Sequence, residues 1–156
     1  MIYGETFFCC NPDGSKSDKI LFPKLQPFYY PDKAEGWLLL EDFSITYNGY
    51  KLTALKGFDY DGASINRIFW TLIGSPMDHD IIVGSMFHDL LYCVHLPEFP
   101  RCETDGLLKY LMGVYYADKA KQTAVYNAVR LFGNNHWTQT PEDIAKYRNL
   151  IKIEQA

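Results

Sequence analysis

The residues of this sequence best suited to chemistry are a histidine, a tyrosine and an aspartate that two neighbouring helices bring to one level. His88 and Tyr92 are one helical turn apart, so they share a face of the segment 80–95. Asp105 lies in the next predicted helix, at a similar distance from the short loop 96–100. An antiparallel pair of helices would place the Asp105 carboxylate beside the His88 imidazole, with Tyr92 within reach of that carboxylate.

A carboxylate that orients an imidazole prepares it to act as a general base. The sequence therefore predicts a hydrolase in which a His88/Asp105 dyad, supported by Tyr92, activates water. Two further carboxylates are candidate ligands for a divalent cation: Asp89, next to His88, and Asp61, in the corner Phe58–Ser64 where the β half ends. Calcium or magnesium suits such oxygen ligands better than zinc does.

The same residues also have a purely structural interpretation. A buried histidine or aspartate without a partner costs several kcal/mol, so the cluster is equally a hydrogen-bonded network that fixes the helical hairpin. Asp61 can likewise cap a turn by accepting backbone N–H bonds. The protein would then act by contacts with other proteins, for which its aromatic content of 16% is suited.

Hydrophobic periodicity divides the chain into a β half and a helical half. Phe43–Tyr47 and Tyr50–Ala54 alternate apolar and polar residues around Asn48–Gly49, a pair typical of two-residue hairpin turns, and Trp37–Leu40 is expected to begin the first arm. Pro27 limits its segment to an edge strand or a loop. Beyond Ser64 the period becomes helical, and helices are expected over about 80–95, 101–116 and 118–132 and from Thr140 onward.

These elements predict an α+β fold: an N-terminal antiparallel β-sheet followed by a helical half with an antiparallel helix hairpin. The length favours a single domain, 1–156, that is mainly β over 1–58 and mainly α over 59–156. Ile82, Phe87, Leu90 and Leu91 are the expected core of the first helix. Gly133 fits the position just after a helix end.

Composition and charge limit the possible partners. With 47% hydrophobic and 22% charged residues the chain is expected to fold into a globular domain, and its net charge of −4 argues against binding long nucleic acid. No transmembrane or signal segment is expected. Cys93 and Cys102 flank a short loop; free thiols are the expectation and a disulfide the alternative.

Several separated motifs occur in the order found in one known family: Phe58–Ile65, Phe69–Trp70, Ile73–Pro76, His88–Tyr92, Glu103–Asp105 and Ala128–Gly133. Over roughly residues 37–137 the chain resembles the phage and prophage family of unknown function numbered thirteen-fifty-three. Asn66, where the family usually has proline, and Gly106–Leu108 depart from its pattern. The resemblance implies a phage or prophage origin, a location in the host cytoplasm or the virion, and partners among other phage proteins or host components. It implies no activity.

A second, local resemblance is to the phospholipase A2 core, carried by His88-Asp89-x-x-Tyr92 and an aspartate on the partner helix. It implies that His88 is the base, Asp89 the calcium ligand and Asp105 the orienting group, with Tyr92 supporting Asp105. The disulfide framework and the Gly-rich calcium loop of that family are missing from this sequence, unless Asp61–Gly62 replaces the loop.

Two hypotheses therefore stay open. In the first the protein is a small hydrolase, with or without the assistance of a metal ion, acting on lipid, peptidoglycan or a nucleotide. In the second it is a non-enzymatic virion or host-takeover interaction protein whose polar cluster is structural. A pocket at the His88 face with a bound ion would favour the first hypothesis. A flat surface there, with the chain found inside a phage particle, would favour the second.

Overall fold

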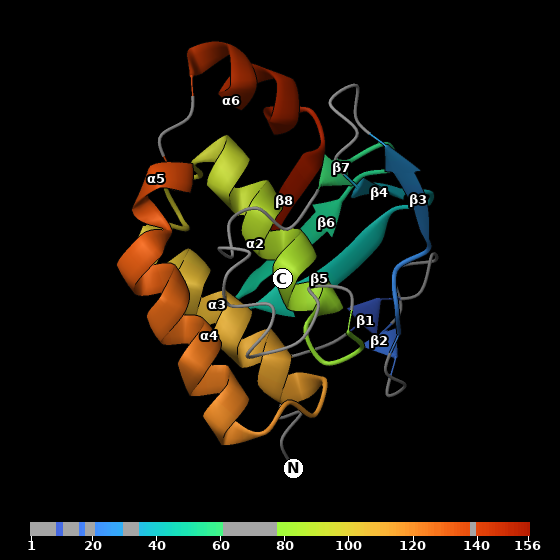
Figure 1. Cartoon of the computed structure of the whole chain (residues 1–156). Helices are drawn as coiled ribbons and strands as arrows, with labels where there is room; N and C mark the ends of the chain where they lie inside the picture. The colour runs from blue at the N-terminus through green and yellow to red at the C-terminus, as the bar shows by residue number, and fades with distance from the viewer. Residues whose placement is uncertain (1–8, 11–15, 18–20, 30–34, 61–77, 138–139) are drawn as a thin grey trace. The chain divides into compact units, whose positions relative to one another are not determined.

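The computed structural model describes residues 9–10, 16–17, 21–29, 35–60, 78–137 and 140–156 (Figure 1). The chain divides into two compact units: a β unit of Met1–Asp61 with Asn149–Ala156, and a helical unit of Gly62–Arg148. Antiparallel strands in the N-terminal half followed by helices confirm the predicted α+β class. The single domain stays a prediction.

All the described strands pair antiparallel, within the β unit. β1 (Cys9–Cys10) pairs with β2 (Lys16–Ser17). β3 (Leu25–Tyr29), β4 (Glu35–Leu39) and β7 (Asp59–Tyr60) form a sheet in the order β3-β4-β7, and β5 (Phe43–Tyr47), β6 (Tyr50–Ala54) and β8 (Ile151–Gln155) form another in the order β5-β6-β8. Pro27 lies in the edge strand β3, where its missing N–H removes no ladder bond from the sheet interior.

The hairpin predicted around Asn48–Gly49 joins β5 to β6. Asn48 and Gly49 have φ angles of 48° and 78°, the positive values that a two-residue hairpin turn requires. The prediction that Trp37–Leu40 begins the first arm is wrong: Trp37 lies in β4 and pairs with Pro27 and Tyr60. Its apolar run therefore belongs to the middle of a different sheet.

β8 is missing from the sequence-based prediction, which extends the helical half to the last residue. Ile151 and Ile153 pair with Ala54 and Leu52, so the end of the chain completes the sheet of the hairpin. The alternation Ile151-Lys152-Ile153-Glu154 is a local signal for a strand, as in β5 and β6, but local periodicity could not indicate that its partner is the distant β6.

The helical unit contains α2 (Ile82–Val94), α3 (Arg101–Val114), α4 (Lys119–Phe132), α5 (Asn134–Trp137) and α6 (Pro141–Arg148). The four predicted helices are confirmed to within a few residues, and α3 packs against both α2 and α4 (Figure 1). Asp118 caps α4 by accepting the Lys121 N–H at 2.7 Å. The short helix α5 occupies residues that follow the predicted third helix.

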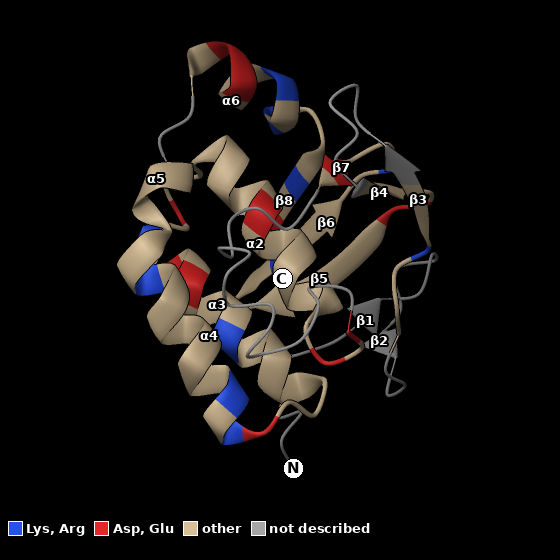
Figure 2. Ribbon diagram, in the orientation of Figure 1, with Lys and Arg blue, Asp and Glu red and all other residues tan. Residues whose placement is uncertain are grey.

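The core of the helical unit lies between these helices. Phe87, Leu90 and Leu91 are fully buried as predicted, whereas Ile82 is only half-buried, although Ile81 and Val83 on either side of it are buried. Figure 2 shows both signs of charge on α3 and α6, only Lys and Arg on α4, and a single acidic residue on α2. Of these helices, none is both long enough and apolar enough to span a membrane. Cys93 and Cys102 are free thiols, as expected.

Candidate functional site

His88 and Tyr92 of α2 meet Asp105 of α3 at a single carboxylate oxygen. The Nε2 atom of His88 lies 2.7 Å from Asp105 Oδ1, and the Tyr92 hydroxyl donates to the same oxygen at 2.6 Å. The predicted juxtaposition of these three side chains is therefore confirmed. Because a carboxylate can only accept, His88 carries its proton on Nε2.

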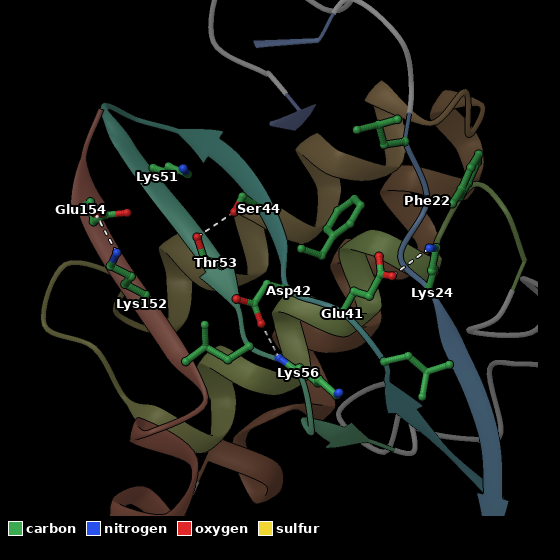
Figure 3. A pocket seen from close by; sticks show the side chains of 14 residues that line it. Phe22, Lys24, Glu41, Asp42, Ser44, Lys51, Thr53, Lys56, Lys152 and Glu154 are labelled. Atoms are coloured by element: carbon green, nitrogen blue, oxygen red, sulfur yellow. Dashed lines mark hydrogen bonds and ion pairs between the residues drawn. The ribbon is translucent and has the colours of Figure 1, made fainter. Parts of the chain in front are cut away.

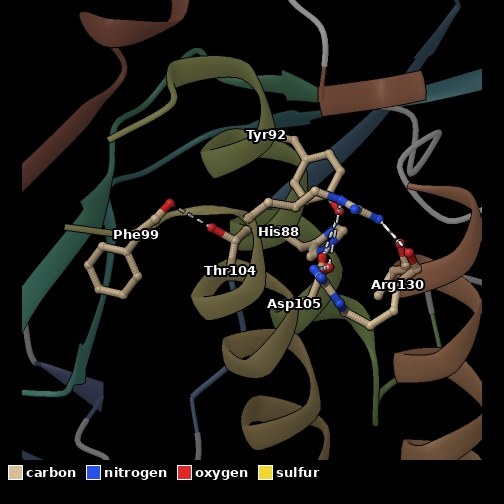
Figure 4. A network of polar contacts seen from close by, with 8 residues as sticks. His88, Tyr92, Phe99, Thr104, Asp105 and Arg130 are labelled. Atoms are coloured by element: carbon tan, nitrogen blue, oxygen red, sulfur yellow. Dashed lines mark hydrogen bonds and ion pairs between the residues drawn. The ribbon is translucent and has the colours of Figure 1, made fainter. Parts of the chain in front are cut away.

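Two arginines complete the surroundings of Asp105 (Figure 4). Arg130 of α4 donates from Nη1 to Asp105 Oδ2 at 2.7 Å, and Arg101 Nε lies 3.9 Å from the same oxygen. Arg101 Nε also donates to the Tyr92 hydroxyl oxygen at 3.2 Å. These five side chains are called the Asp105 network; they join α2, α3 and α4 around one negative charge.

Arg101 has a second function at the end of α4. Its Nη2 atom donates to the backbone carbonyls of Val129 and Arg130, each at 2.7 Å. The Val129 carbonyl also accepts the Gly133 N–H at 2.8 Å, whereas the Arg130 carbonyl is among the last four of the helix, which have no intrahelical partner. A cation is favourable at this end of a helix. Arg101 therefore fixes the C-terminal turn of α4 to the start of α3.

Gly133 closes the network from the other side. A Cβ atom built on Gly133 would lie 2.6 Å from the Tyr92 hydroxyl and would also collide with the Val129 carbonyl. The backbone angle φ of Gly133 is −70°, which any residue adopts. Glycine is thus needed here for close approach to Tyr92, and not for the left-handed conformation expected of a residue after a helix end.

An aromatic layer covers Tyr92. The rings of His88 and Tyr92 are 4.2 Å apart, and Trp137 of α5 meets Tyr92 edge-on at 5.0 Å. His95, which ends α2 in a left-handed conformation with φ of 52°, stacks on Trp137 at 4.1 Å. α5 therefore closes the end of the α2–α3 hairpin over the network.

The two central side chains, those of His88 and Asp105, are 0% exposed. Burial lowers the pKa of His88 and outweighs the opposing effect of Asp105, so the imidazole is neutral. A protonated His88 would add a third cation to the two guanidinium groups that already face one carboxylate.

Asp105 stays ionised in spite of its burial. Burial alone would raise the pKa of Asp105, but hydrogen bonds from His88, Tyr92 and Arg130 outweigh it and hold the pKa below its ordinary value. The Tyr92 phenol has a raised pKa because it is buried and donates to Asp105. The pKa of Arg130 is raised by its hydrogen bond to Asp105.

Of the two predicted cation ligands, the structure describes only Asp89. Asp89 lies on α2 next to His88 and is 7% exposed, and Asp61 lies outside the described residues. In the described ranges no group of three or more His, Cys, Asp or Glu residues is arranged to hold a metal ion. The cation at Asp89 and Asp61 stays a prediction.

Three residues of the site have no function assigned from the sequence alone: Arg101, Arg130 and Gly133. Arg130 and Gly133 fall within Ala128–Gly133, one of the motifs noted above, and Arg101 precedes Asp105 by one helical turn. That spacing could have indicated the contact between Arg101 and Asp105 from the sequence, because side chains one turn apart lie on the same face of a helix.

Comparison with known proteins identifies a family. Residues 37–129, more than half of the chain, match the family model described as "Protein of unknown function (DUF1353)". The uncharacterized protein y4jT of Sinorhizobium fredii (strain NBRC 101917 / NGR234) is 32% identical over 109 residues, which cover 64% of this chain and 29% of that protein. The chain thus matches less than a third of the length of this relative. No solved structure is significantly similar to the chain.

We predict that Gly133→Ala destabilises the protein by about 1–3 kcal/mol, because the added methyl group must displace the Tyr92 hydroxyl or the end of α4. Gly106→Ala in α3 is the matched control: a Cβ there meets nothing within 4 Å, and alanine favours a helix by about 0.5–1 kcal/mol. Urea unfolding of both variants measures the difference. Equal effects of the two substitutions would contradict the close approach at Gly133.

We also predict that the free energy of unfolding decreases as the pH falls below 6.5, the ordinary pKa of histidine. Because the folded-state pKa of His88 is lower, the unfolded chain takes up this proton first, and stability is lost as the pH falls toward the folded value. Asp105 adds a second loss below 3.8, the ordinary pKa of aspartate, for the same reason.

Urea unfolding at a series of pH values between about 7.5 and 5 isolates the contribution of His88. His88→Gln should reduce the change in the free energy of unfolding over this pH range. His79→Gln, at an exposed position, should leave that change as it is in the wild type. A wild-type protein that became more stable on acidification would mean that His88 is charged in the folded state.

Proposed function

The chain belongs to the DUF1353 family of proteins of unknown function, and on that premise we propose that it is a non-enzymatic interaction protein of a phage or prophage. In this proposal the Asp105 network is structural, and a surface of the helical unit binds another protein. The partner is another phage protein or a host component, met in the virion or in the host cytoplasm.

The complete burial of the His88/Asp105 pair carries the proposal. A general base must reach the proton that it abstracts, directly or through one water. His88 is 0% exposed, and its Nε2 proton is held by a carboxylate that also accepts from Tyr92 and Arg130. Such saturation is typical of a buried polar network that specifies a fold.

The proposed contact surface is the end of α4. Leu131 and Phe132 are consecutive apolar residues there, with exposed fractions of 73% and 46%. The preceding carbonyls, those of Val129 and Arg130, are held by Arg101. The network thus presents two large apolar side chains on a fixed helix end, and a rigid apolar anchor is what a protein interface needs at its centre.

Hydrolysis is the second candidate, favoured by the 2.7 Å contact between His88 and Asp105. The nucleophile would be water, because the buried hydroxyl of Ser85, on the same face of α2, has no hydrogen-bond partner among the described residues and so no contact with a base there. Arg130, whose side chain is 34% exposed, would have to leave Asp105 before water could enter. Asp89 and Asp61 would hold the cation in this version.

We predict that the double variant Leu131→Ser/Phe132→Ser lowers the yield of infectious particles at least about tenfold when its gene replaces the wild-type gene in the phage or prophage. The two substitutions remove the apolar anchors of the proposed contact. Tyr116→Ser is the matched control, since Tyr116 is 65% exposed near the other end of α4. Melting of the purified variants checks that both remain folded.

His88→Asn separates the two candidates in the same assay. A structural network predicts that this variant melts at a lower temperature yet still supports particle production wherever it is folded. Loss of function in folded His88→Asn, together with full function of the Leu131/Phe132 variant, would favour the hydrolase and overturn the proposal.

A further inference from the structure

The β unit holds a pocket of about 900 Å³ over the polar face of the β5-β6-β8 sheet (Figure 3). One row of this face runs across all three strands, because Ser44 pairs with Thr53 and Thr53 pairs with Lys152. The volume lies within the range of pockets that take small molecules. All residues that line the pocket belong to the β unit, whereas those of the Asp105 network belong to the helical unit.

Two hydroxyl groups form the floor of the pocket. Ser44 Oγ and Thr53 Oγ1 are 2.7 Å apart, and Thr53 is only 8% exposed. Each of the two hydroxyl groups carries one proton, and only one of these protons is donated in the hydrogen bond between them. The second proton is available to an acceptor in the pocket.

The charges around this floor favour an anion. Four lysines and three carboxylates line the pocket. Lys24 pairs with Glu41 at 2.8 Å and Lys152 with Glu154 at 3.1 Å, while Asp42 accepts a backbone N–H at 2.7 Å. In the part of the chain that the structure describes, the ammonium groups of Lys51 and Lys56 have no carboxylate partner.

The opposite wall carries apolar side chains beside the Lys24–Glu41 ion pair. Phe22 and Leu40 line the pocket with exposed fractions of 50% and 37%. Figure 3 shows Ser44, Thr53 and Lys51 on one side of the pocket and Phe22 on the other. The two sides therefore differ in chemistry, one donating hydrogen bonds and the other offering an apolar surface.

We propose that this pocket binds a small organic anion that joins an acidic group to an apolar or aromatic group. The acidic group lies against Lys51 and the Ser44/Thr53 hydroxyls, where both a positive charge and a free proton are available. The apolar group covers Phe22 and Leu40. This binding is independent of the protein contact proposed for α4.

Phenyl phosphate combines both groups and serves as the probe, titrated calorimetrically into the full chain, with amide NMR signals locating the site. Phenyl phosphate should bind at least about tenfold more tightly than inorganic phosphate or phenol, because each of these fills one side only. Shifts should concentrate on β5, β6 and β8. If inorganic phosphate bound as tightly as phenyl phosphate, the apolar wall would contribute nothing to binding. The pocket would then be a site for simple anions, and the proposal would be overturned.

Lys51→Met should weaken phenyl phosphate binding about tenfold, the usual range for a charge-assisted hydrogen bond, and Ser44→Ala should weaken it to a smaller extent. Lys119→Met is the matched control, since it removes the same charge from an exposed position on α4. Equal weakening by Lys51→Met and Lys119→Met would mean that only net charge matters. That result, or shifts outside the β unit, would also overturn the proposal.

Discussion

The fold of the helical unit depends on how one buried negative charge is compensated. An ionised carboxylate removed from water is costly unless charged and hydrogen-bonding partners surround it. Asp105 meets this requirement with donors from each neighbouring helix: His88 and Tyr92 from α2 and Arg130 from α4. Apolar packing between these helices is non-directional, whereas these hydrogen bonds have fixed partners and lengths. The charge therefore determines which faces of α2, α3 and α4 meet.

The burial of the Asp105 charge also distinguishes the hydrolase hypothesis from the hypothesis of an interaction protein. A catalytic dyad and a structural pair can have the same donor–acceptor distance, so the 2.7 Å contact between His88 and Asp105 does not distinguish them. Access to water does distinguish them. Both side chains are fully buried, and the aromatic ring of Trp137 packs on Tyr92 beside them. Because Arg101 connects the network to the last carbonyls of α4, its most direct consequence for the surface is the fixed position of Leu131 and Phe132.

Features determined by local sequence could be predicted, and those determined by distant partners could not. The Asn48–Gly49 turn and the helix boundaries follow from backbone preferences within a few residues. The His88–Asp105 contact could be predicted because a short loop fixes the level of two adjacent helices. By contrast, β8 pairs with a strand far away in the sequence, and Arg130 reaches Asp105 from a third helix whose rotation no local pattern gives. Gly133 fitted a helix end by type, but its steric function needs the position of Tyr92.

The central claim, that the ionised Asp105 holds the three helices together, is tested most directly by the free energy of unfolding of Asp105→Asn. This substitution keeps the shape of the side chain and removes its charge, which leaves the partly exposed Arg130 guanidinium facing a neutral amide in place of a carboxylate. We expect Asp105→Asn to lower the free energy of unfolding by about 3–5 kcal/mol, the range for removing one partner of a buried ion pair. Glu103→Gln, the same chemical change at an exposed position of α3, should stay within about 0.5 kcal/mol of the wild type. An Asp105→Asn protein as stable as Glu103→Gln would contradict the account.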